Sequence, residues 1–590
     1  MTREASLPTP SQASRAWRLL PPVPAETKEA LLRSSCPPFL VPFLYHRGME
    51  SAAQAQAFLA PNKVSHDPFL LPGMERAVPR LAEALAQREP IGIFGDFDVD
   101  GVTATALLAR ALGALGATIL AYIPHRVQEG HGLNTQAIQH LARQDVRLLI
   151  TVDCGITAHR EIAEATQAGM DTIVTDHHLA PMGAPQALAV VNPQLPGSRY
   201  PFPHLSGAGL AWKLAQALYQ ALGPKAPPLP PDLLALAALS TVADVAPLVN
   251  ENRSIVRQGL LELAHPRTPG LRALLSTARL RPEAVDTDAI AWALAPRINA
   301  AGRMAHASIS YHLLMEETEE RAAALAALLE QHNRRRQELA EETMAKASAL
   351  LQTSPDATDP GRTPLLMVGD PSFSPGVTGL VASRLVEEFY RPAVVVSVGP
   401  EVSRGSCRSI KEFDIGTALH QAAQQVAGVL RYGGHRQAAG FTIATPQLPA
   451  LRERLCLLAE TSLDLQALRP GMEIDLEVPL RSLPRDAYRT VQLLAPFGEG
   501  NPRPVFLSRQ VQVLDARAVG ADGHHLRLRL RDGPATWDAI AFRQGQRSGD
   551  ALDVTASTGR SIDIVYSLAT DRWGPEETLQ LQVLDFRPSH

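Results

Sequence analysis

An apolar run leads into three aspartates at alternate positions in the segment Ile91-Gly92-Ile93-Phe94-Gly95-Asp96-Phe97-Asp98-Val99-Asp100-Gly101. Carboxylates this close together repel one another unless cations lie among them. Oxygen ligands of this kind suit the hard divalent cations Mg²⁺ and Mn²⁺. A buried strand followed by an acidic turn also fits an open α/β sheet, in which ligands bind beyond the carboxyl ends of the strands. Taken alone, the segment also fits a solvated acidic turn.

The composition sets the broad class of protein. The chain has 590 residues, too many for one hydrophobic core, so several domains are expected. A hydrophobic content of 45% with 20% charged residues is typical of a soluble globular protein. The net charge of −4 means that any nucleic-acid surface is a local basic patch.

The cysteines and the terminal segments bear on the cellular compartment. Four cysteines lie far apart without CxxC spacing, which predicts neither a disulfide framework nor a zinc site. We find no signal-peptide pattern and no apolar run long enough to span a bilayer. The expectation is therefore a cytoplasmic protein with no membrane association.

The hydrophobic pattern divides the chain into five parts. Residues 1–72 read as a leader with a small helical segment, and residues 73–308 alternate short β-like runs with helical stretches, which favours a mostly parallel sheet. Residues 309–352 read as one long connecting helix, followed by a linker. Residues 363–465 form a second α/β unit.

The last part, residues 470–590, has a different pattern. Its β-like runs include Leu526-Arg527-Leu528-Arg529-Leu530-Arg531, where strict alternation puts apolar groups on one face and guanidinium groups on the other. Several short strands of this kind predict a small barrel such as an OB-fold. The expected fold class is thus α/β, with two α/β lobes joined by a long helix and a C-terminal OB-like β-barrel.

Further acidic and imidazole groups follow other predicted strands. Asp153 ends one buried-type strand, Asp176-His177-His178 ends the next, and Asp244 follows a helical stretch. Because the carboxyl ends of parallel strands meet at one edge of a sheet, these groups can converge there. A two-metal site needs several carboxylates, one of them bridging, with imidazole to complete the ligand shells. Singly, each residue also fits an ordinary turn aspartate or a hydrogen-bonded histidine.

These motifs resemble the DHH phosphoesterase superfamily, and within it the bacterial RecJ single-strand-specific exonucleases. The resemblance runs from about residue 58 to the C-terminus, and its motifs match in order and spacing. They are Gly-Asp-Phe-Asp-Val-Asp-Gly (95–101), Val-Asp-Cys-Gly-Ile (152–156), Thr-Asp-His-His-Leu (175–179), Thr-Val-Ala-Asp-Val-Ala-Pro-Leu (241–248), Pro-Arg-Ile-Asn-Ala-Ala-Gly-Arg-Met (296–304) and Gly-Gly-His (433–435).

The resemblance implies a metal site and catalytic residues. It implies two divalent ions, Mn²⁺ or Mg²⁺, with ligands from Asp96, Asp98, Asp100, Asp153, His177 and Asp244. It makes Asp153 and His178 the catalytic candidates, with His178 against the scissile phosphate as an acid or electrostatic stabiliser. Two such cations would hold the phosphodiester, lower the pKa of a bound water and neutralise the leaving oxygen.

The second lobe carries phosphate-binding residue types. Residues 403–409, Ser-Arg-Gly-Ser-Cys-Arg-Ser, combine arginine forks with hydroxyl and glycine N–H donors, although an ordinary polar loop is the alternative. By resemblance this lobe is a DHHA1 domain that grips nucleic acid, and Ser406 and Arg408 anchor a terminal 5′ phosphate, with Arg126 as a further candidate. Arg303 is expected in a loop before the connecting helix, where it would contact the nucleic-acid strand that enters the site. Gly433-Gly434-His435 would let backbone approach the substrate closely.

Two positions depart from the family pattern. The tyrosine that the family usually has in Gly-Tyr-Gly-Leu is His131 here, and Phe373-Ser374-Pro375 replaces the usual Trp-His before Gly-Val. Neither position is a metal ligand in the resemblance. These departures therefore bear on substrate grip, rate or metal optimum and leave hydrolysis intact.

The resemblance implies a metal-dependent 5′→3′ exonuclease that hydrolyses single-stranded DNA to mononucleotides in recombination and repair, beside single-strand-binding protein and a helicase. One alternative is a DHH phosphodiesterase acting on short oligonucleotides or cyclic dinucleotides; the arginine-bearing terminal module favours longer strands. Another is a non-catalytic nucleic-acid-binding scaffold. The sequence leaves open the choice between Mg²⁺ and Mn²⁺, the choice between DNA and RNA, and the oligomeric state.

Overall fold

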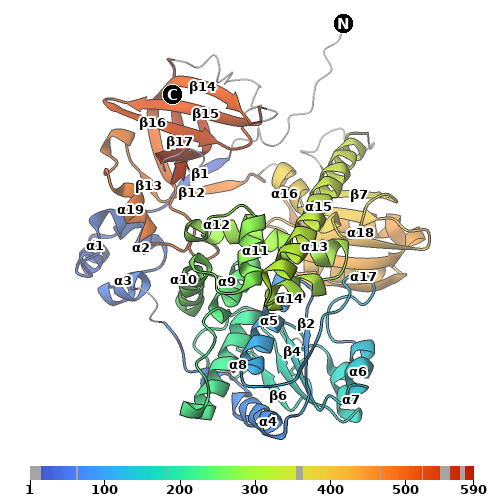
Figure 1. Ribbon diagram of the computed structural model, residues 1–590. Coiled ribbons are helices and arrows are strands. Elements are labelled where there is room, and N and C mark those ends of the chain that lie inside the picture. Colours follow the sequence, from blue (N-terminus) through green and yellow to red (C-terminus); the bar gives the residue numbers. More distant parts are fainter. Residues whose placement is uncertain are drawn as a thin grey trace. The chain divides into compact units, whose positions relative to one another are not determined.

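The computed structural model describes residues 15–60, 64–180, 182–353, 363–465, 467–520, 523–544, 559–571 and 578–589 (Figure 1). The chain divides into two compact units. One comprises residues 56–336 with residues 494–502, and the other comprises residues 1–55, 337–493 and 503–590. Among the described residues, no helix combines the length and apolar character that crossing a membrane requires.

The described part of the first unit is built on a parallel five-stranded sheet. Across the sheet the strands are β3 (Ile119–Tyr122), β2 (Ile91–Gly95), β4 (Leu148–Val152), β5 (Asp171–Thr175) and β6 (Ala189–Val191). Every residue of β2 and β4 is buried, which explains their largely apolar sequences. The mostly parallel sheet predicted for this part of the chain is confirmed.

Helices cover both faces of this sheet. One face packs on α4 (Met74–Gln87), α5 (Val99–Gly113) and α8 (Gly207–Leu222), and the other packs on α6 (Thr135–Ala142) and α7 (His159–Gln167). Beyond α8 follow α9 (Leu233–Ala243), α10 (Asn250–Ala264), α11 (Pro269–Thr277), the short α12 (Thr287–Ala289), α13 (Ala295–Met304) and α14 (Ser308–Met315).

The prediction of one continuous helix over residues 309–352 is wrong. The structure has α14, a break, and then the long α15 (Glu319–Thr353), which begins in the first unit and ends in the second. At the break, Glu316 Oε1 accepts hydrogen bonds from the backbone N–H groups of Glu317 and Thr318 and from the Thr318 hydroxyl. A side-chain acceptor that takes such N–H groups offers the backbone an alternative to the helical hydrogen bonds and so competes with helix continuation.

The second α/β sheet is mixed. Its strands lie in the order β10 (Val429–His435), β11 (Ala438–Ala444), β9 (Val402–Arg408), β8 (Ala393–Ser397) and β7 (Leu366–Asp370), and β7 and β8 are parallel while the other neighbours are antiparallel. The helix α16 (Thr378–Phe389) packs on one face, and α17 (Ile415–Gln425) and α18 (Leu448–Ser462) pack on the other. Residues 403–408, for which a polar loop was the alternative, belong to β9.

The C-terminal strands form a closed barrel. They are β14 (Phe506–Val519), β15 (His525–Asp532), β16 (Ala535–Ala541), β18 (Thr578–Pro588) and β17 (Ser561–Asp571), and pairing of β14 with β17 closes the ring. In β15 the leucines are buried and the arginines are exposed, so the predicted alternation is confirmed.

The N-terminal segment belongs to the same unit as the barrel. Its strand β1 (Ala16–Leu19) pairs in parallel with β12 (Gly471–Ile474), and the helices α1 (Ala25–Leu32) and α2 (Val41–His46) follow. Phe43 of α2 packs edge-on against Phe506 of β14, with ring centroids 5.4 Å apart. The leader expected before this segment lies largely outside the described residues.

Candidate metal centre and phosphate-binding groups

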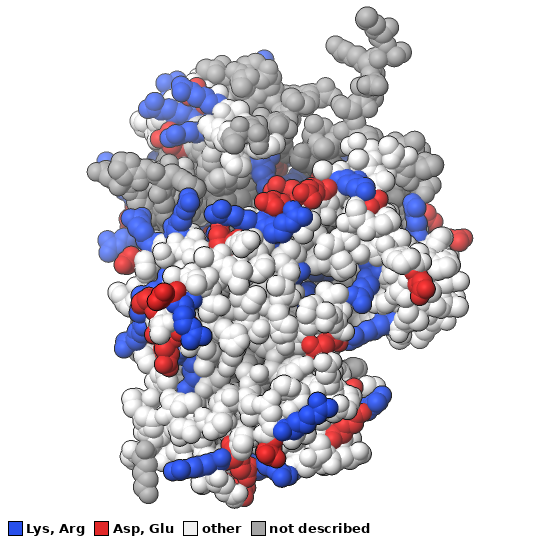
Figure 2. Space-filling model, turned by 45° about the vertical axis from the view of Figure 1, so that its right-hand side comes forward, with Lys and Arg blue, Asp and Glu red and all other residues white. Residues whose placement is uncertain are grey.

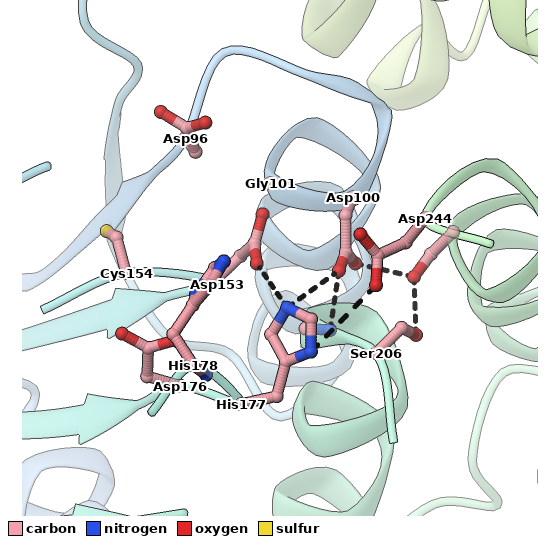
Figure 3. Close-up of polar contacts among 12 residues, drawn as sticks. Asp96, Asp100, Gly101, Asp153, Cys154, Asp176, His177, His178, Ser206 and Asp244 are labelled. Atoms are coloured by element: carbon pink, nitrogen blue, oxygen red, sulfur yellow. Dashed lines mark hydrogen bonds and ion pairs between the residues drawn. The ribbon is translucent and has the colours of Figure 1, made fainter. Parts of the chain in front are cut away.

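The acidic motifs meet at the carboxyl ends of three adjacent strands. Gly95 of β2 lies opposite Val152 of β4, and Val152 lies opposite Thr175 of β5. The next residue of each strand is therefore an aspartate at the same level of the sheet: Asp96, Asp153 and Asp176. Parallel register alone thus brings together groups that are far apart in the sequence (Figure 3).

The start of α5 arranges two further carboxylates. Asp98 is the N-cap of α5, and its Oδ1 accepts a hydrogen bond of 3.1 Å from the Gly101 N–H. Asp100 lies in the first turn of that helix and is 2% exposed. Its carboxylate accepts hydrogen bonds from the N–H groups of Gly207 (2.7 Å) and Ala208 (2.8 Å) and from the Ser240 hydroxyl (2.5 Å). Asp100 is therefore fixed from three sides.

The N-terminus of α8 supplies two of these donors. A Cβ atom on Gly207 would lie 2.6 Å from Asp153 Cβ and 3.1 Å from Asp100 Oδ1, so only glycine lets the helix come this close. The positive end of the helix dipole then faces Asp100. Our sequence analysis missed this contribution, although Ser206, the N-cap residue before a run of small residues, was a readable signal of a helix start.

His177 lies among the carboxylates. Its Nε2 is 3.0 Å from Asp153 Oδ1 and 3.6 Å from Asp100 Oδ2, and its Nδ1 is 3.8 Å from Asp244 Oδ2 (Figure 3). All six predicted metal ligands fall into groups whose ligand atoms lie within 4.8 Å of one another: Asp96 with Asp98 and Asp153, Asp100 with His177 and Asp244, and Asp153 with His177 and His178. Asp153 belongs to two of these groups, which suits a bridging carboxylate.

The electrostatics of the cluster favour bound cations. Burial, together with repulsion from Asp96 and Asp100, raises the pKa of Asp98 to about 6. Burial and the charges of Asp100 and Asp98 raise the pKa of Asp244 to about 8. The pKa of the buried Asp153 is raised well above its usual value for the same reasons. Without cations, these carboxyls keep their protons to a higher pH than ordinary carboxyls do.

One buried oxygen supports the fit of a divalent ion. Asp96 is 3% exposed, and its Oδ1 accepts no hydrogen bond within the part of the chain that the structure describes. A buried carboxylate oxygen without a donor is costly. Hard oxygen ligands with imidazole are a donor set that Mn²⁺ and Mg²⁺ accept, so the residues present fit such an ion.

His178 is held by Asp176, a residue to which our sequence analysis assigned no role. Asp176 Oδ1 lies 2.7 Å from His178 Nδ1, and the carboxylate also accepts the N–H groups of His178 and Ile156. Burial lowers the pKa of His178, but the hydrogen bond and charge of Asp176 outweigh it and raise that pKa to about 9. The contact with Asp176 therefore favours the protonated imidazole.

Two predicted substrate-binding arginines lie in the first unit. Arg126 is stacked over the Phe97 ring, 4.6 Å from its centroid; burial lowers its pKa, while Asp98 and Asp96 act in the opposite direction. Arg303 lies in the last turn of α13, so its expected place in a loop is wrong. Pro296 stands in the first turn of that helix, where proline is tolerated, and the alanine-rich run continues the helix to Met304.

The phosphate-binding residues of the second sheet lie on neighbouring strands. Ser406 and Arg408 are two residues apart on β9 and therefore share a face. Across the sheet, Ser406 lies opposite Gly440 and Gly440 opposite Gly433, while Arg408 lies opposite Ala438, which pairs with His435. The sheet register thus places the predicted residues Ser406, Arg408, Gly433 and His435 in two rows, and Gly434 stands between them on β10.

Thr378, at the start of α16, is a further polar group at this face. Its hydroxyl lies 2.9 Å from Ser406 Oγ. A Cβ atom on Gly379 would lie 3.2 Å from Arg408 Nη2, so glycine gives the guanidinium its space beside the helix start. Neither residue was predicted from the sequence, because no motif marks them.

A parallel sheet whose strand ends carry a carboxylate–imidazole cluster, with a second α/β domain and a barrel, defines a DHH-type phosphoesterase. The profile of the DHH family N-terminal domain matches residues 90–241, that of the DHHA1 domain residues 363–461, and that of the RecJ OB domain residues 474–585. The chain belongs to the RecJ family of single-stranded-DNA-specific exonucleases.

Several relatives carry the name single-stranded-DNA-specific exonuclease RecJ. That of Thermus thermophilus is 35% identical over 97% of this chain and 78% of its own length. That of Bacillus subtilis is 34% identical over 96% of this chain and 70% of its own length. That of Escherichia coli is 30% identical over 94% of this chain and 97% of its own length. The resemblance read from the motifs is confirmed.

Solved structures agree with the fold. The structure of Thermus thermophilus RecJ with Mn²⁺ matches with a TM-score of 0.81 at 31% identity, covering 98% of this chain and 80% of that one. The same protein with Mg²⁺ matches with a TM-score of 0.75 at 30% identity, covering 98% and 79%. The expected fold class is confirmed, and the expected cofactors are the two ions that these structures hold.

The raised pKa values predict how metal and protons compete. The pKa of these carboxyls is higher in the folded protein than in the unfolded protein. The metal-free folded state therefore loses stability as the pH rises from about 4 toward 8, the pKa of Asp244. Metal binding requires the same groups deprotonated. We expect the melting temperature in EDTA to fall between pH 6 and pH 8, and Mn²⁺ to raise it more at pH 8. Differential scanning calorimetry measures both effects, and a Mn²⁺ effect that is larger at pH 6 would contradict the assignment.

Proposed function

We propose that this chain hydrolyses single-stranded DNA from its 5′ end in the 5′→3′ direction, releasing mononucleotides. The observation that carries the proposal is the set of carboxylates and imidazoles at the ends of β2, β4 and β5, with Asp153 shared between two potential ligand groups. Ligands would come from the six residues predicted from the sequence. The solved structures of a relative with Mn²⁺ and with Mg²⁺ support the choice of ion.

The cations, when bound, would hold the phosphodiester, lower the pKa of a water and neutralise the leaving oxygen. The residues of the protein position the ligands and supply a proton donor. Asp100 is fixed by the N-terminus of α8 and by Ser240, so the ligand set is preorganised. His178, protonated and bound through Nδ1 to Asp176, presents its Nε2–H to an oxygen of the scissile phosphate or to the leaving oxygen.

The start of α16 with β9 suits a terminal phosphate. The backbone N–H groups of Thr378 and Gly379 donate to no other group in the described part of the chain, and no side chain caps the helix. Free N–H groups at a helix start attract anions. The Ser406 hydroxyl and the Arg408 guanidinium lie beside them. A terminal phosphate carries more charge than an internal diester, so this site favours a 5′-phosphorylated end.

The barrel would hold the strand by its backbone. Arg527, Arg529 and Arg531 are exposed along β15. Figure 2 shows basic and acidic side chains intermixed over the described surface of one face, in keeping with the net charge of −4. DNA binding therefore depends on local rows of basic residues such as these arginines. Aromatic residues make up 5% of the chain, so we expect backbone charge to outweigh base stacking.

We further propose action in the cytoplasm beside single-strand-binding protein and a helicase.

The function is tested by digesting single-stranded DNA labelled at the 5′ or the 3′ end, with Mn²⁺ or with EDTA. We expect immediate release of labelled mononucleotide from the 5′ end, none from a duplex, and none with EDTA. Asp153→Asn should abolish the activity while leaving the fold intact by circular dichroism, because it removes a charged ligand shared by two groups.

Other results would select the alternatives. Cleavage confined to dinucleotides or very short oligomers would contradict the exonuclease and favour a phosphodiesterase of the same superfamily. Tight strand binding by the folded, Mn²⁺-loaded protein with no cleavage would favour a non-catalytic scaffold.

The terminal-phosphate site is tested by Arg408→Gln. Loss of a charge-assisted contact of about 1.5–3 kcal/mol should raise KM for a 5′-phosphorylated strand roughly 10- to 100-fold. KM for a 5′-hydroxyl strand should change little, and so should kcat. Arg469→Gln, on an exposed residue outside the sheet, is the control. Equal effects on both 5′ ends would contradict the assignment.

The barrel is tested by the salt dependence of DNA binding. Each phosphate contact to single-stranded DNA contributes about 0.7 to the slope of log K against log salt concentration. Changing Arg527, Arg529 and Arg531 together to glutamine should therefore reduce that slope by about 2 if each contacts one phosphate. Fluorescence anisotropy with a labelled oligonucleotide measures the slope, with Arg485→Gln as the control outside the barrel strands. An unchanged slope would exclude this face.

A further inference from the structure

His131 contacts one of the predicted metal ligands. Its Nδ1 lies 3.1 Å from Asp96 Oδ2, within hydrogen-bond distance. Its ring also stands edge-on to the rings of Phe97 and His178, with centroids 6.3 Å and 6.0 Å away. This residue, where the family pattern has tyrosine, therefore lies at the edge of the metal centre.

The two oxygens of Asp96 have different surroundings. Oδ2 faces His131, whereas Oδ1 is buried and accepts no hydrogen bond from the described residues. A carboxylate oxygen of Asp96 also lies within 4.8 Å of ligand atoms of Asp98 and Asp153. In Figure 3, Asp96 stands at the end of β2, away from the contacts around His177. Asp96 therefore lacks the helix N–H groups and hydroxyl that fix Asp100.

The loop that carries His131 is itself fixed. Glu129 accepts hydrogen bonds from the His125 N–H (2.7 Å), the Tyr122 hydroxyl (2.8 Å) and the Asn134 side-chain amide (3.1 Å). These contacts join the end of β3 to the start of α6 across the loop. The imidazole is thus presented to Asp96 from an organised segment, although its side chain is 52% exposed.

We propose that His131 is a positioning residue of the metal centre: its Nδ1–H donates to Asp96 Oδ2 and holds Oδ1 toward a divalent cation. The inference rests on the proposed function, since it assumes that a cation binds at Asp96. A ligand that rotates freely binds metal less tightly than one fixed by a hydrogen bond, and loss of such an outer partner typically weakens metal affinity about 10- to 100-fold.

The test measures Mn²⁺ affinity directly, by electron paramagnetic resonance of free Mn²⁺ during titration of metal-free protein. We expect His131→Ala to weaken the affinity about 10- to 100-fold. His131→Asn places an amide donor near the position of Nδ1 and should restore most of the affinity. His131→Gln places its donor near the position of Nε2 and should not. Melting temperatures in EDTA confirm that each variant is folded.

A double-mutant cycle separates positioning from a general structural effect. If His131 acts through Asp96, the loss caused by His131→Ala should largely disappear in an Asp96→Asn background, because contacting residues that share a role are not additive. Additive losses would overturn the proposal, as would a His131→Ala affinity within about twofold of that of the unmodified protein. Absence of Mn²⁺ binding by the unmodified protein would overturn the metal centre itself and this inference with it.

Discussion

The carboxylates at the strand ends of the first unit repel one another, and the elements around them are arranged to offset this repulsion. Asp96, Asp100 and Asp153 are each nearly inaccessible to solvent, and Asp98 and Asp244 lie against them. Like charges in a place with little water raise one another's pKa and destabilise the fold unless positive charge is supplied. The N-terminus of α8 and the guanidinium of Arg126 supply part of this positive charge. Divalent cations bound among these carboxylates would supply the remainder.

Parallel strand register explains why the centre was predictable. A sequence that ends buried strands with acidic residues commits those residues to one edge of the sheet, since neighbouring parallel strands end together. The aspartates after β2 and β4 and the Asp-His-His after β5 meet for this reason. The exposed arginines of β15 were predictable in the same way, because a period of two is itself the geometry of a strand.

The contacts that fix the ligands were not predictable. Asp100 is held by Gly207, Ala208 and Ser240, which lie more than 100 residues away in the sequence and meet it only through the packing of α5 against α8 and α9. Asp176 looked like part of a metal motif, but its hydrogen bonds commit it to His178 and Ile156. The end of α14 was also not predictable from the local sequence. The acidic residues at the break are common on solvated helix faces, so they do not mark a helix end.

Crystals grown with Mn²⁺ and measured at the manganese absorption edge would show whether cations occupy the carboxylate cluster. We expect two anomalous peaks in the first unit, ligated by Asp96, Asp98, Asp100, Asp153, His177 and Asp244, with Asp153 contacting both. We also expect the Asp153→Asn variant to lose one or both of these peaks. Anomalous density at other residues, or none at the ends of β2 and β4, would contradict the view that this carboxylate cluster is built around cations.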